Sequence, residues 1–140
     1  MKKQFLGFEL MRVMISDCDG EHQIVLKEMT GNRQLPIAIG TFEALAIHSK
    51  VHDVVPPRPM THDLLGNIVN DLDLELKEVL IDSYAVNQDG HTGTFHGKLV
   101  FDSPIGERVV DCRPSDGIAL AVRLDIPISV HESVIESQAV

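Results

Sequence analysis

One short segment of the chain combines residue types that carry out acid–base and phosphate chemistry. Arg58-Pro59-Met60-Thr61-His62-Asp63 places a guanidinium, an imidazole and a carboxylate within six residues, at the expected start of a helix. An arginine beside a helix N-terminus can bind phosphate or carboxylate, because both the guanidinium and the free N–H groups donate to oxygen. The imidazole of His62 could accept or donate a proton as an acid–base group. In the alternative interpretation, Asp63 only complements the helix dipole and pairs with Arg58.

A second segment, Arg113-Pro114-Ser115-Asp116, repeats this order of an arginine, a proline, a residue type that caps helices and a carboxylate. We expect Ser115 to be the N-cap of its helix and not a nucleophile, since no histidine lies at a spacing that would activate it. Glu43 is a third carboxylate in the first turn of an expected helix. Capping alone would also explain Glu43 and Asp116.

Histidine and cysteine spacing gives no equally good site. His48 and His52 lie four residues apart, as zinc ligands on a helix do, but no glutamate stands between them in an H-E-x-x-H pattern and no third ligand is apparent. We therefore interpret them as exposed histidines near a helix end. Cys18 and Cys112 lie far apart in no C-x-x-C arrangement, so we expect two free, half-buried thiols.

The alternation of apolar and turn-forming residues predicts the elements that must position these groups. We expect strands over 5–16, 22–29, 34–39, 74–86, 92–101, 107–112 and 127–130. We expect three main helices, over 41–48, from an N-cap at Thr61 to Leu72, and over 116–124. Asp17-Cys18-Asp19-Gly20 should form a hairpin turn, and Pro36 indicates an edge strand. The tail over 131–140 should form a last helical turn or fray.

Two stretches of the chain echo each other at one offset. Gly31-Asn32-Arg33 matches Gly106-Glu107-Arg108 in two of three positions, and Ala44-Leu45-Ala46-Ile47 matches Ala119-Leu120-Ala121-Val122 at the same separation. This predicts an α+β fold with a mixed or antiparallel sheet, built from two pseudo-duplicated strand-strand-strand-helix units. In the alternative interpretation, Ala-Leu-Ala is simply common in helices.

Composition sets the class of protein. The chain has 140 residues, 44% hydrophobic and 24% charged, which predicts one folded domain over 1–140. It has no run of about 18 apolar residues and its N-terminus develops no apolar h-region, so we expect a cytoplasmic protein that does not bind membranes. The formal net charge of -9 argues against a broad basic face for nucleic acid, so any such contact would need a local basic patch or a bridging metal.

The order and spacing of several blocks resemble the bifunctional nuclease domain family. The blocks lie at 35–40 and 43–47, at Thr61-His62-Asp63-Leu64-Leu65 and its preceding 57–60, and at Arg113-Pro114-Ser115-Asp116 with the following 117–121. The resemblance extends from the first strand to about residue 130. It departs from the family at Ala38, where many relatives carry a large residue, and at Gly117, where alanine is usual and a glycine weakens a helix by up to ~1 kcal/mol.

The resemblance implies DNase and RNase activity. On this hypothesis Arg58 and Arg113 neutralise the scissile phosphate and His62 serves as acid or base. Asp63, Asp116 and Glu43 would complete the catalytic set and bind a divalent cation, for which carboxylate ligands favour Mg²⁺ or Mn²⁺. All of these groups can share one site only if the three helix starts converge in space.

A second hypothesis needs no catalysis. The two Arg-Pro segments would recognise an anionic ligand or an acidic partner segment, and the apolar helices over 41–48 and 116–124 would pack against another copy of the chain. The acidic net charge and the scarcity of aromatic residues favour this alternative. A third interpretation treats both Arg-Pro segments as ion pairs that hold helices to the sheet. On either functional hypothesis we expect a homo-oligomer.

Overall fold

A seven-stranded mixed sheet forms the frame of the molecule, with strand order β3-β2-β1-β7-β4-β5-β6. The computed structural model describes residues 4–18 and 20–140. Its strands are β1 (Phe5–Met14), β2 (His22–Glu28), β3 (Gln34–Ile39), β4 (Glu75–Val86), β5 (Gly93–Ser103), β6 (Gly106–Cys112) and β7 (Ile128–His131). Among the strands of the described residues, β4 and β7 alone pair in parallel. Asp19 of the expected Asp17–Gly20 turn, and Met1 to Lys3, lie outside the described residues.

The strand order confirms the predicted pseudo-duplication. Strands β1, β2 and β3 form one antiparallel meander and β4, β5 and β6 form another, with β7 between the two. Each meander runs into a helix, α1 (Thr41–Val51) after the first and α3 (Pro114–Leu124) after the second. Gly31 and Gly106 lie at corresponding hairpin turns, and Ala44 and Ala119 are both fully buried. The echo in the sequence therefore marks equivalent positions of two structural units.

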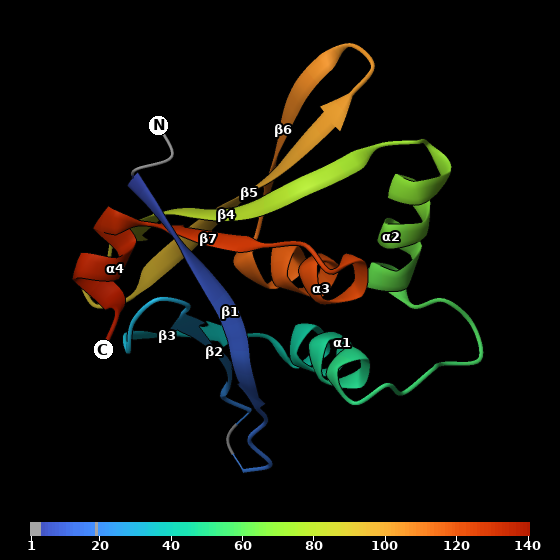
Figure 1. Cartoon of the computed structure of the whole chain (residues 1–140). Helices are drawn as coiled ribbons and strands as arrows, with labels where there is room; N and C mark the ends of the chain where they lie inside the picture. The colour runs from blue at the N-terminus through green and yellow to red at the C-terminus, as the bar shows by residue number, and fades with distance from the viewer. Residues whose placement is uncertain (1–3, 19) are drawn as a thin grey trace.

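Helices gather at one end of this frame. In Figure 1, α1 and α3 lie alongside each other and α2 (Thr61–Asp71) stands next to α3, and both α1 and α2 contact α3. A fourth helix, α4 (Glu132–Gln138), covers β4 and β7 away from that group. The helices α1 and α2, which carry some of the predicted chemical residues, thus both pack against α3, which carries the others. No helix of residues 4–18 and 20–140 has the length and apolar character needed to span a membrane.

The hydrophobic core lies between the sheet and α3. Helix α3 is buried from Pro114 to Ala121 at every position except Asp116. A helix that other elements surround on nearly all sides needs apolar residues on nearly all sides, which explains its apolar sequence. The apolar residues of α3 therefore pack within this chain and give no support for contact with a second copy. On α1, by contrast, Phe42 and Leu45 are exposed, and the predicted homo-oligomer now rests on that helix.

The two predicted helix N-caps differ from those in the structure. Thr61 and Ser115 are not N-caps: α2 begins after Met60 and α3 after Arg113, so Thr61 is the first residue of α2 and Ser115 is the second residue of α3. Pro114 occupies the first position of α3, where its missing N–H costs nothing. The N-cap signal was misread because threonine and serine are also tolerated inside a first turn.

The C-terminal tail is helical and does not fray. Val134 and Ile135 on α4 are almost completely buried, and His131 Nδ1 accepts a hydrogen bond from the Ser133 amide at 3.0 Å. Beyond α4, Val140 and Gln34 exchange two backbone hydrogen bonds of 2.8 and 2.9 Å. This pairing occupies part of the β3 edge. The edge position that Pro36 predicted for β3 is confirmed.

The two cysteines are free, as expected. Cys112 is half-buried, whereas Cys18 is exposed, so the expected burial is correct for only one of them. Burial, reinforced by the nearby Asp116 carboxylate, raises the pKa of the Cys112 thiol to about 12. Cys112 is therefore a protonated, weakly reactive thiol at neutral pH.

Gly117 lets α3 approach the sheet closely. A Cβ at this position would lie 2.5 Å from Cγ1 of Val79 on β4, far inside van der Waals contact. The glycine that weakens the helix locally therefore permits the packing of α3 against the core strand. Gly66, inside α2, offers a matched contrast, since a Cβ there would meet only Leu124 Cδ2 at 3.7 Å.

We expect Gly117→Ala to lower the free energy of unfolding by about 1–3 kcal/mol, because the added methyl overpacks the contact with Val79. Gly66→Ala should instead raise it by about 0.5–1 kcal/mol, through better helix propensity alone. Urea denaturation of both variants beside the wild type measures the two changes. An unchanged or higher stability of Gly117→Ala would show that α3 does not require a glycine there.

Candidate catalytic pocket between three helices

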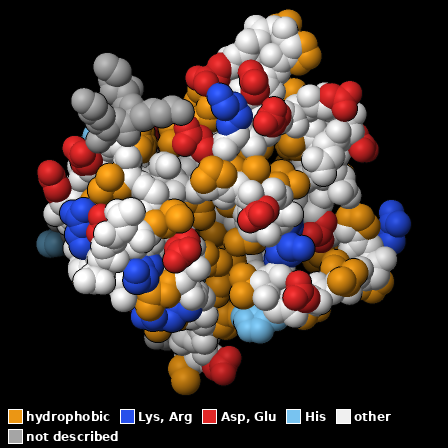
Figure 2. All heavy atoms as spheres, in the orientation of Figure 1, with side chains coloured by type: hydrophobic (Ala, Val, Ile, Leu, Met, Phe, Trp, Pro, Cys, Tyr) orange, Lys and Arg blue, Asp and Glu red, His pale blue; other side chains and the backbone are white. Residues whose placement is uncertain are grey.

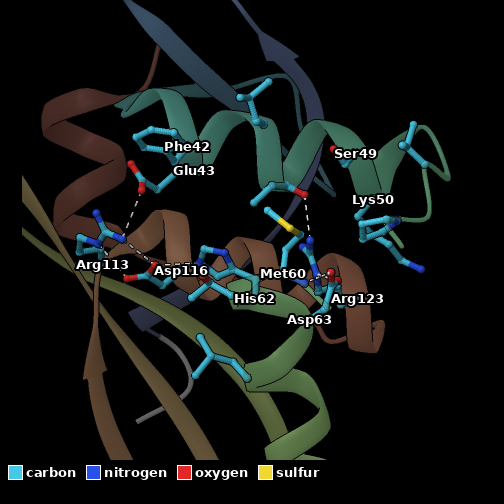
Figure 3. Close-up of a pocket in the computed structure, with 16 residues that line it drawn as sticks. Phe42, Glu43, Ser49, Lys50, Met60, His62, Asp63, Arg113, Asp116 and Arg123 are labelled. Carbon is cyan, nitrogen blue, oxygen red and sulfur yellow. Dashed lines mark hydrogen bonds and ion pairs between the residues drawn. The ribbon is translucent and has the colours of Figure 1, made fainter. Parts of the chain in front are cut away.

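A pocket of about 500 Å³ opens where α1, α2 and α3 meet, and we call it the helix pocket (Figure 3). It is lined by Phe42, Glu43, Leu45, Ala46, Ser49, Lys50, Val54, Pro56, Met60, Thr61, His62, Asp63, Leu65, Arg113, Asp116 and Arg123. Five of the six predicted catalytic residues are in this set, although they come from positions 43 to 116. Pockets of this volume typically hold small-molecule ligands or substrate groups.

Asp116 joins two of the predicted groups at one end of the helix pocket. Arg113 donates to both of its oxygens, from Nε to Oδ2 at 2.8 Å and from Nη2 to Oδ1 at 2.8 Å. His62 Nε2 lies 3.0 Å from the same Oδ1. Arg113 Nη2 also lies 3.7 Å from Glu43 Oε2. Figure 3 shows Arg113, Asp116 and His62 in one row, with Glu43 of α1 above Arg113.

The ionisation of Asp116 sets the tautomer of His62. Burial by itself would raise the pKa of Asp116, but the hydrogen bonds from Arg113 and His62 outweigh burial and hold this pKa below its ordinary value of 3.8. Asp116 is therefore a carboxylate at neutral pH, and His62 Nε2 must be the donor in their hydrogen bond. Nδ1 is then the basic nitrogen of a neutral His62, and none of the described residues hydrogen-bonds to it.

Asp63 has a different partner from the one expected. Its Oδ1 accepts a 2.7 Å hydrogen bond from Arg123 Nε, and its Oδ2 accepts from the Met60 amide at 3.0 Å. The Arg123 side chain is only 9% exposed and also donates to the carbonyl oxygens of Ala119 and Ala46. The predicted Arg58–Asp63 pair is therefore wrong, because Arg123 occupies the carboxylate. Asp63 and Arg123 hold α2 against α3 and α1.

Arg58 lies outside the helix pocket. It sits in an exposed bend of the α1–α2 connection and forms no hydrogen bond or ion pair with any residue that the structure describes. Arg123 was missed by sequence reasoning, although a usable signal was present. It lies seven residues after Asp116, on the same helical face, and an arginine inside an otherwise apolar helix requires a buried partner. Lys50, in the last turn of α1, also lines the helix pocket, and no pattern in the sequence marks it as a site residue.

The three carboxylates assigned to a divalent cation do not form a ready-made metal site. Asp63 is held by Arg123, whereas Glu43 and Asp116 share Arg113. Across residues 4–18 and 20–140, no group of three or more His, Cys, Asp or Glu side chains is placed to hold a metal ion. A cation at Glu43 and Asp116 would have to replace the Arg113 guanidinium, so the residues present fit an arginine and not a metal.

The pocket carries no excess of charge. Its three carboxylates are matched by Lys50, Arg113 and Arg123. Over the face shown in Figure 2, basic and acidic side chains alternate with apolar ones and gather into no continuous basic area. Nucleic acid would therefore have to be recognised at individual groups in a pocket, since a wide field of positive charge is missing from this face.

The family model described as the bifunctional nuclease domain matches residues 24–140, a range that begins inside β2 and includes every later strand and helix that the structure describes. The chain belongs to the bifunctional nuclease domain family.

Two curated relatives from Mycobacterium tuberculosis, one from strain CDC 1551 / Oshkosh and one from strain ATCC 25618 / H37Rv, are each 44% identical over 112 residues. Both are described as uncharacterized proteins. The match covers 80% of this chain and 63% of each relative, so the chain spans less than two thirds of their length.

The Asp63–Arg123 pair predicts a pH-dependent stability. The hydrogen bond from Arg123 lowers the pKa of Asp63 below 3.8, and the Met60 amide adds to this against the opposing effect of burial. A depressed pKa in the folded state means that the carboxylate stabilises the fold above about pH 4 and that this contribution is lost as the pH falls through the folded pKa.

We therefore expect Asp63→Asn to lower the free energy of unfolding by about 1–3 kcal/mol at pH 7, and by progressively less below about pH 4. Urea denaturation between pH 7 and pH 3 measures both values. Asp71→Asn, an exposed change on the same helix, is the control and should stay within about 0.5 kcal/mol of the wild type. A difference for Asp63→Asn that is the same at both pH values would contradict the charged pair.

Proposed function

We propose that the helix pocket is the active site of a nuclease that hydrolyses phosphodiester bonds of DNA and RNA. The observation that supports this proposal is the hydrogen-bonded row of Arg113, Asp116 and His62, which brings a guanidinium and an imidazole together in one pocket. Binding of a phosphate and activation of a water would need these two kinds of group. Membership of the bifunctional nuclease domain family supports the same class of reaction.

His62 would act as the general base. A carboxylate that accepts from one imidazole nitrogen leaves the other nitrogen as a proton acceptor and stabilises the imidazolium that forms. In the proposed reaction Nδ1 takes a proton from the attacking water as its oxygen bonds to phosphorus. The bond from phosphorus to the leaving sugar oxygen then breaks, and that oxygen takes a proton from the His62 imidazolium or from solvent.

Arg113 would bind the phosphate. Its side chain is 61% exposed, and Nη1 takes part in none of its contacts with Asp116 or Glu43. A guanidinium held in place by a carboxylate needs no reorganisation to meet the charge that develops on the phosphate oxygens. We assign Asp116 the role of orienting both groups, and Asp63 the role of positioning His62, its neighbour in the chain.

A non-enzymatic binding function remains the second candidate, because one observation favours it. Both arginines of the helix pocket are already paired with carboxylates, and the lining of the pocket includes the apolar residues Phe42, Leu45 and Leu65. Such a lining suits an anionic ligand with an apolar body. On this alternative the purified protein would bind nucleic acid or another anion and leave it intact.

We expect His62→Ala to reduce cleavage of single-stranded DNA and RNA by about 100- to 10,000-fold, the usual contribution of a general base. His52→Ala is the matched control, since His52 is exposed and lies outside the helix pocket, and it should cleave at the wild-type rate. Circular dichroism melting of each variant separates loss of fold from loss of chemistry. Cleavage by His62→Ala at the wild-type rate would rule out this site.

Metal dependence is a separate arm of the same assay. Each protein is assayed with added Mg²⁺, with added Mn²⁺ and with a chelator. Activity that disappears with the chelator and returns with one of the two ions would support the divalent cation predicted from the sequence, and would require Arg113 to move from Glu43 and Asp116. Activity that persists in the chelator would support a reaction carried by His62 and Arg113 alone.

A further inference from the structure

A second pocket, of about 540 Å³, lies on the other side of Arg113. We call it the sheet pocket, because strands β2, β3, β4 and β5 supply most of its lining and the first turn of α3 closes one end. Glu43 and Arg113 line both this pocket and the helix pocket. A flexible polymer that occupied the sheet pocket would therefore continue past Arg113 toward His62.

An aromatic platform forms one side of the sheet pocket. Tyr84 on β4 and Phe95 on β5 are cross-strand partners, with ring centroids 4.7 Å apart in an edge-to-face arrangement. The Tyr84 ring also lies against Gly93, where a Cβ would collide with the ring. Phe95 and Gly93 therefore fix the orientation of a tyrosine that borders the cavity. Aromatic side chains that line a groove are common stacking surfaces for unpaired bases.

The part of the sheet pocket that α3 lines offers groups that bind phosphate. Ser115 lines the cavity, is only 5% exposed, and its side chain hydrogen-bonds to none of the described residues. Its hydroxyl oxygen is not among the fully buried polar atoms that lack a partner, so it is open to a ligand or to water and can donate to either or accept from either. Ser115 lies in the first turn of α3, where main-chain N–H groups have no partner within the helix, and Arg113 stands beside it.

We propose that the sheet pocket binds one unpaired nucleotide of a single-stranded nucleic acid, with its base on Tyr84 and its phosphate between Arg113 and Ser115. This inference rests on the proposed nuclease function and names its substrate class. A base in a duplex is stacked and paired on all sides, so only an unpaired base can enter the cavity. The carboxamides of Gln23 and Gln138 also line it, and each can donate to or accept from a base edge.

The Glu43 carboxylate should weaken binding of a phosphate. Removing its charge should therefore change the affinity in the direction opposite to the loss of Tyr84 or Ser115. The Glu43 carboxylate lies 3.7 Å from Arg113 Nη2 and borders the same pocket. A phosphate beside Arg113 meets this negative charge, so removing the charge should strengthen nucleotide binding. A role for Tyr84 and Ser115 in stability alone would not produce a variant that binds more tightly.

The experiment measures binding of a fluorescein-labelled thymidine hexanucleotide by fluorescence anisotropy, in the His62→Ala background so that no cleavage occurs. We expect Tyr84→Leu to weaken binding roughly 5- to 150-fold, as the loss of one base–aromatic stack predicts, while Tyr84→Phe binds as its parent does. Ser115→Ala should weaken binding by several-fold, and Glu43→Gln should strengthen it. Phe5→Leu, outside both pockets, is the matched control and should change nothing.

Binding that is equal in Tyr84→Leu and Tyr84→Phe would overturn the proposal, as would a duplex of the same length that binds as tightly as the single strand. Thermal melting confirms that each variant is folded at the temperature of the assay. Denaturing electrophoresis shows whether the probe stays intact during the assay. Cleavage of the probe in the His62→Ala background would contradict the role of His62 in catalysis, whereas equal binding of intact probe by Tyr84→Leu and Tyr84→Phe would contradict the sheet pocket, so the two failures are distinguishable.

Discussion

The Arg123 guanidinium is the contact on which the geometry of the helix pocket depends. It lies almost buried among three helices, where it donates to Asp63 on α2, to the Ala46 carbonyl on α1 and to the Ala119 carbonyl on its own helix. A buried guanidinium without these partners would be strongly destabilising, so the three helices are held in one arrangement. His62 precedes Asp63 in the chain, and it is this arrangement that brings its imidazole to Asp116.

Asp116 is the carboxylate that orients both Arg113 and His62. It is the half-buried exception on a buried helix, and it is kept ionised by the two groups that it orients. Because one of its oxygens accepts from both Arg113 and His62, the guanidinium and the imidazole are fixed relative to each other. Under the proposed function these are the phosphate-binding group and the base, held by one carboxylate in a protein of net charge -9.

Much of the fold was predictable, since the helices and strands follow from local patterns of apolar and turn residues. The internal echo even revealed two equivalent units, because Gly31 and Gly106 mark the same turn and Ala44 and Ala119 the same buried position. Helix boundaries were less predictable: serine and threonine near a helix start do not show which residue adopts the extended cap conformation.

The candidate site was predictable in most of its charged members, although Arg58 lies outside it and Lys50 and Arg123 were not predicted, and it was not predictable in its pairings. Glu43, His62, Asp63, Arg113 and Asp116 do line one pocket, yet the partner of Asp63 is 60 residues away at Arg123 and not at nearby Arg58. Such pairing depends on how helices pack, which local sequence does not encode. The same limit hid the sheet pocket, where Tyr84 and Ser115 come from separate elements that only the folded chain brings together.

The most direct test of the central claim, that His62 and Arg113 act as one site through Asp116, is a double-mutant cycle. It compares kcat/KM for cleavage of a single-stranded oligonucleotide by the wild type, His62→Ala, Arg113→Ala and the double variant. Groups that act as a unit lose activity non-additively, so the double variant should be little worse than the more damaged single variant. Losses that multiply would contradict the account, because they would mean that the two residues contribute independently.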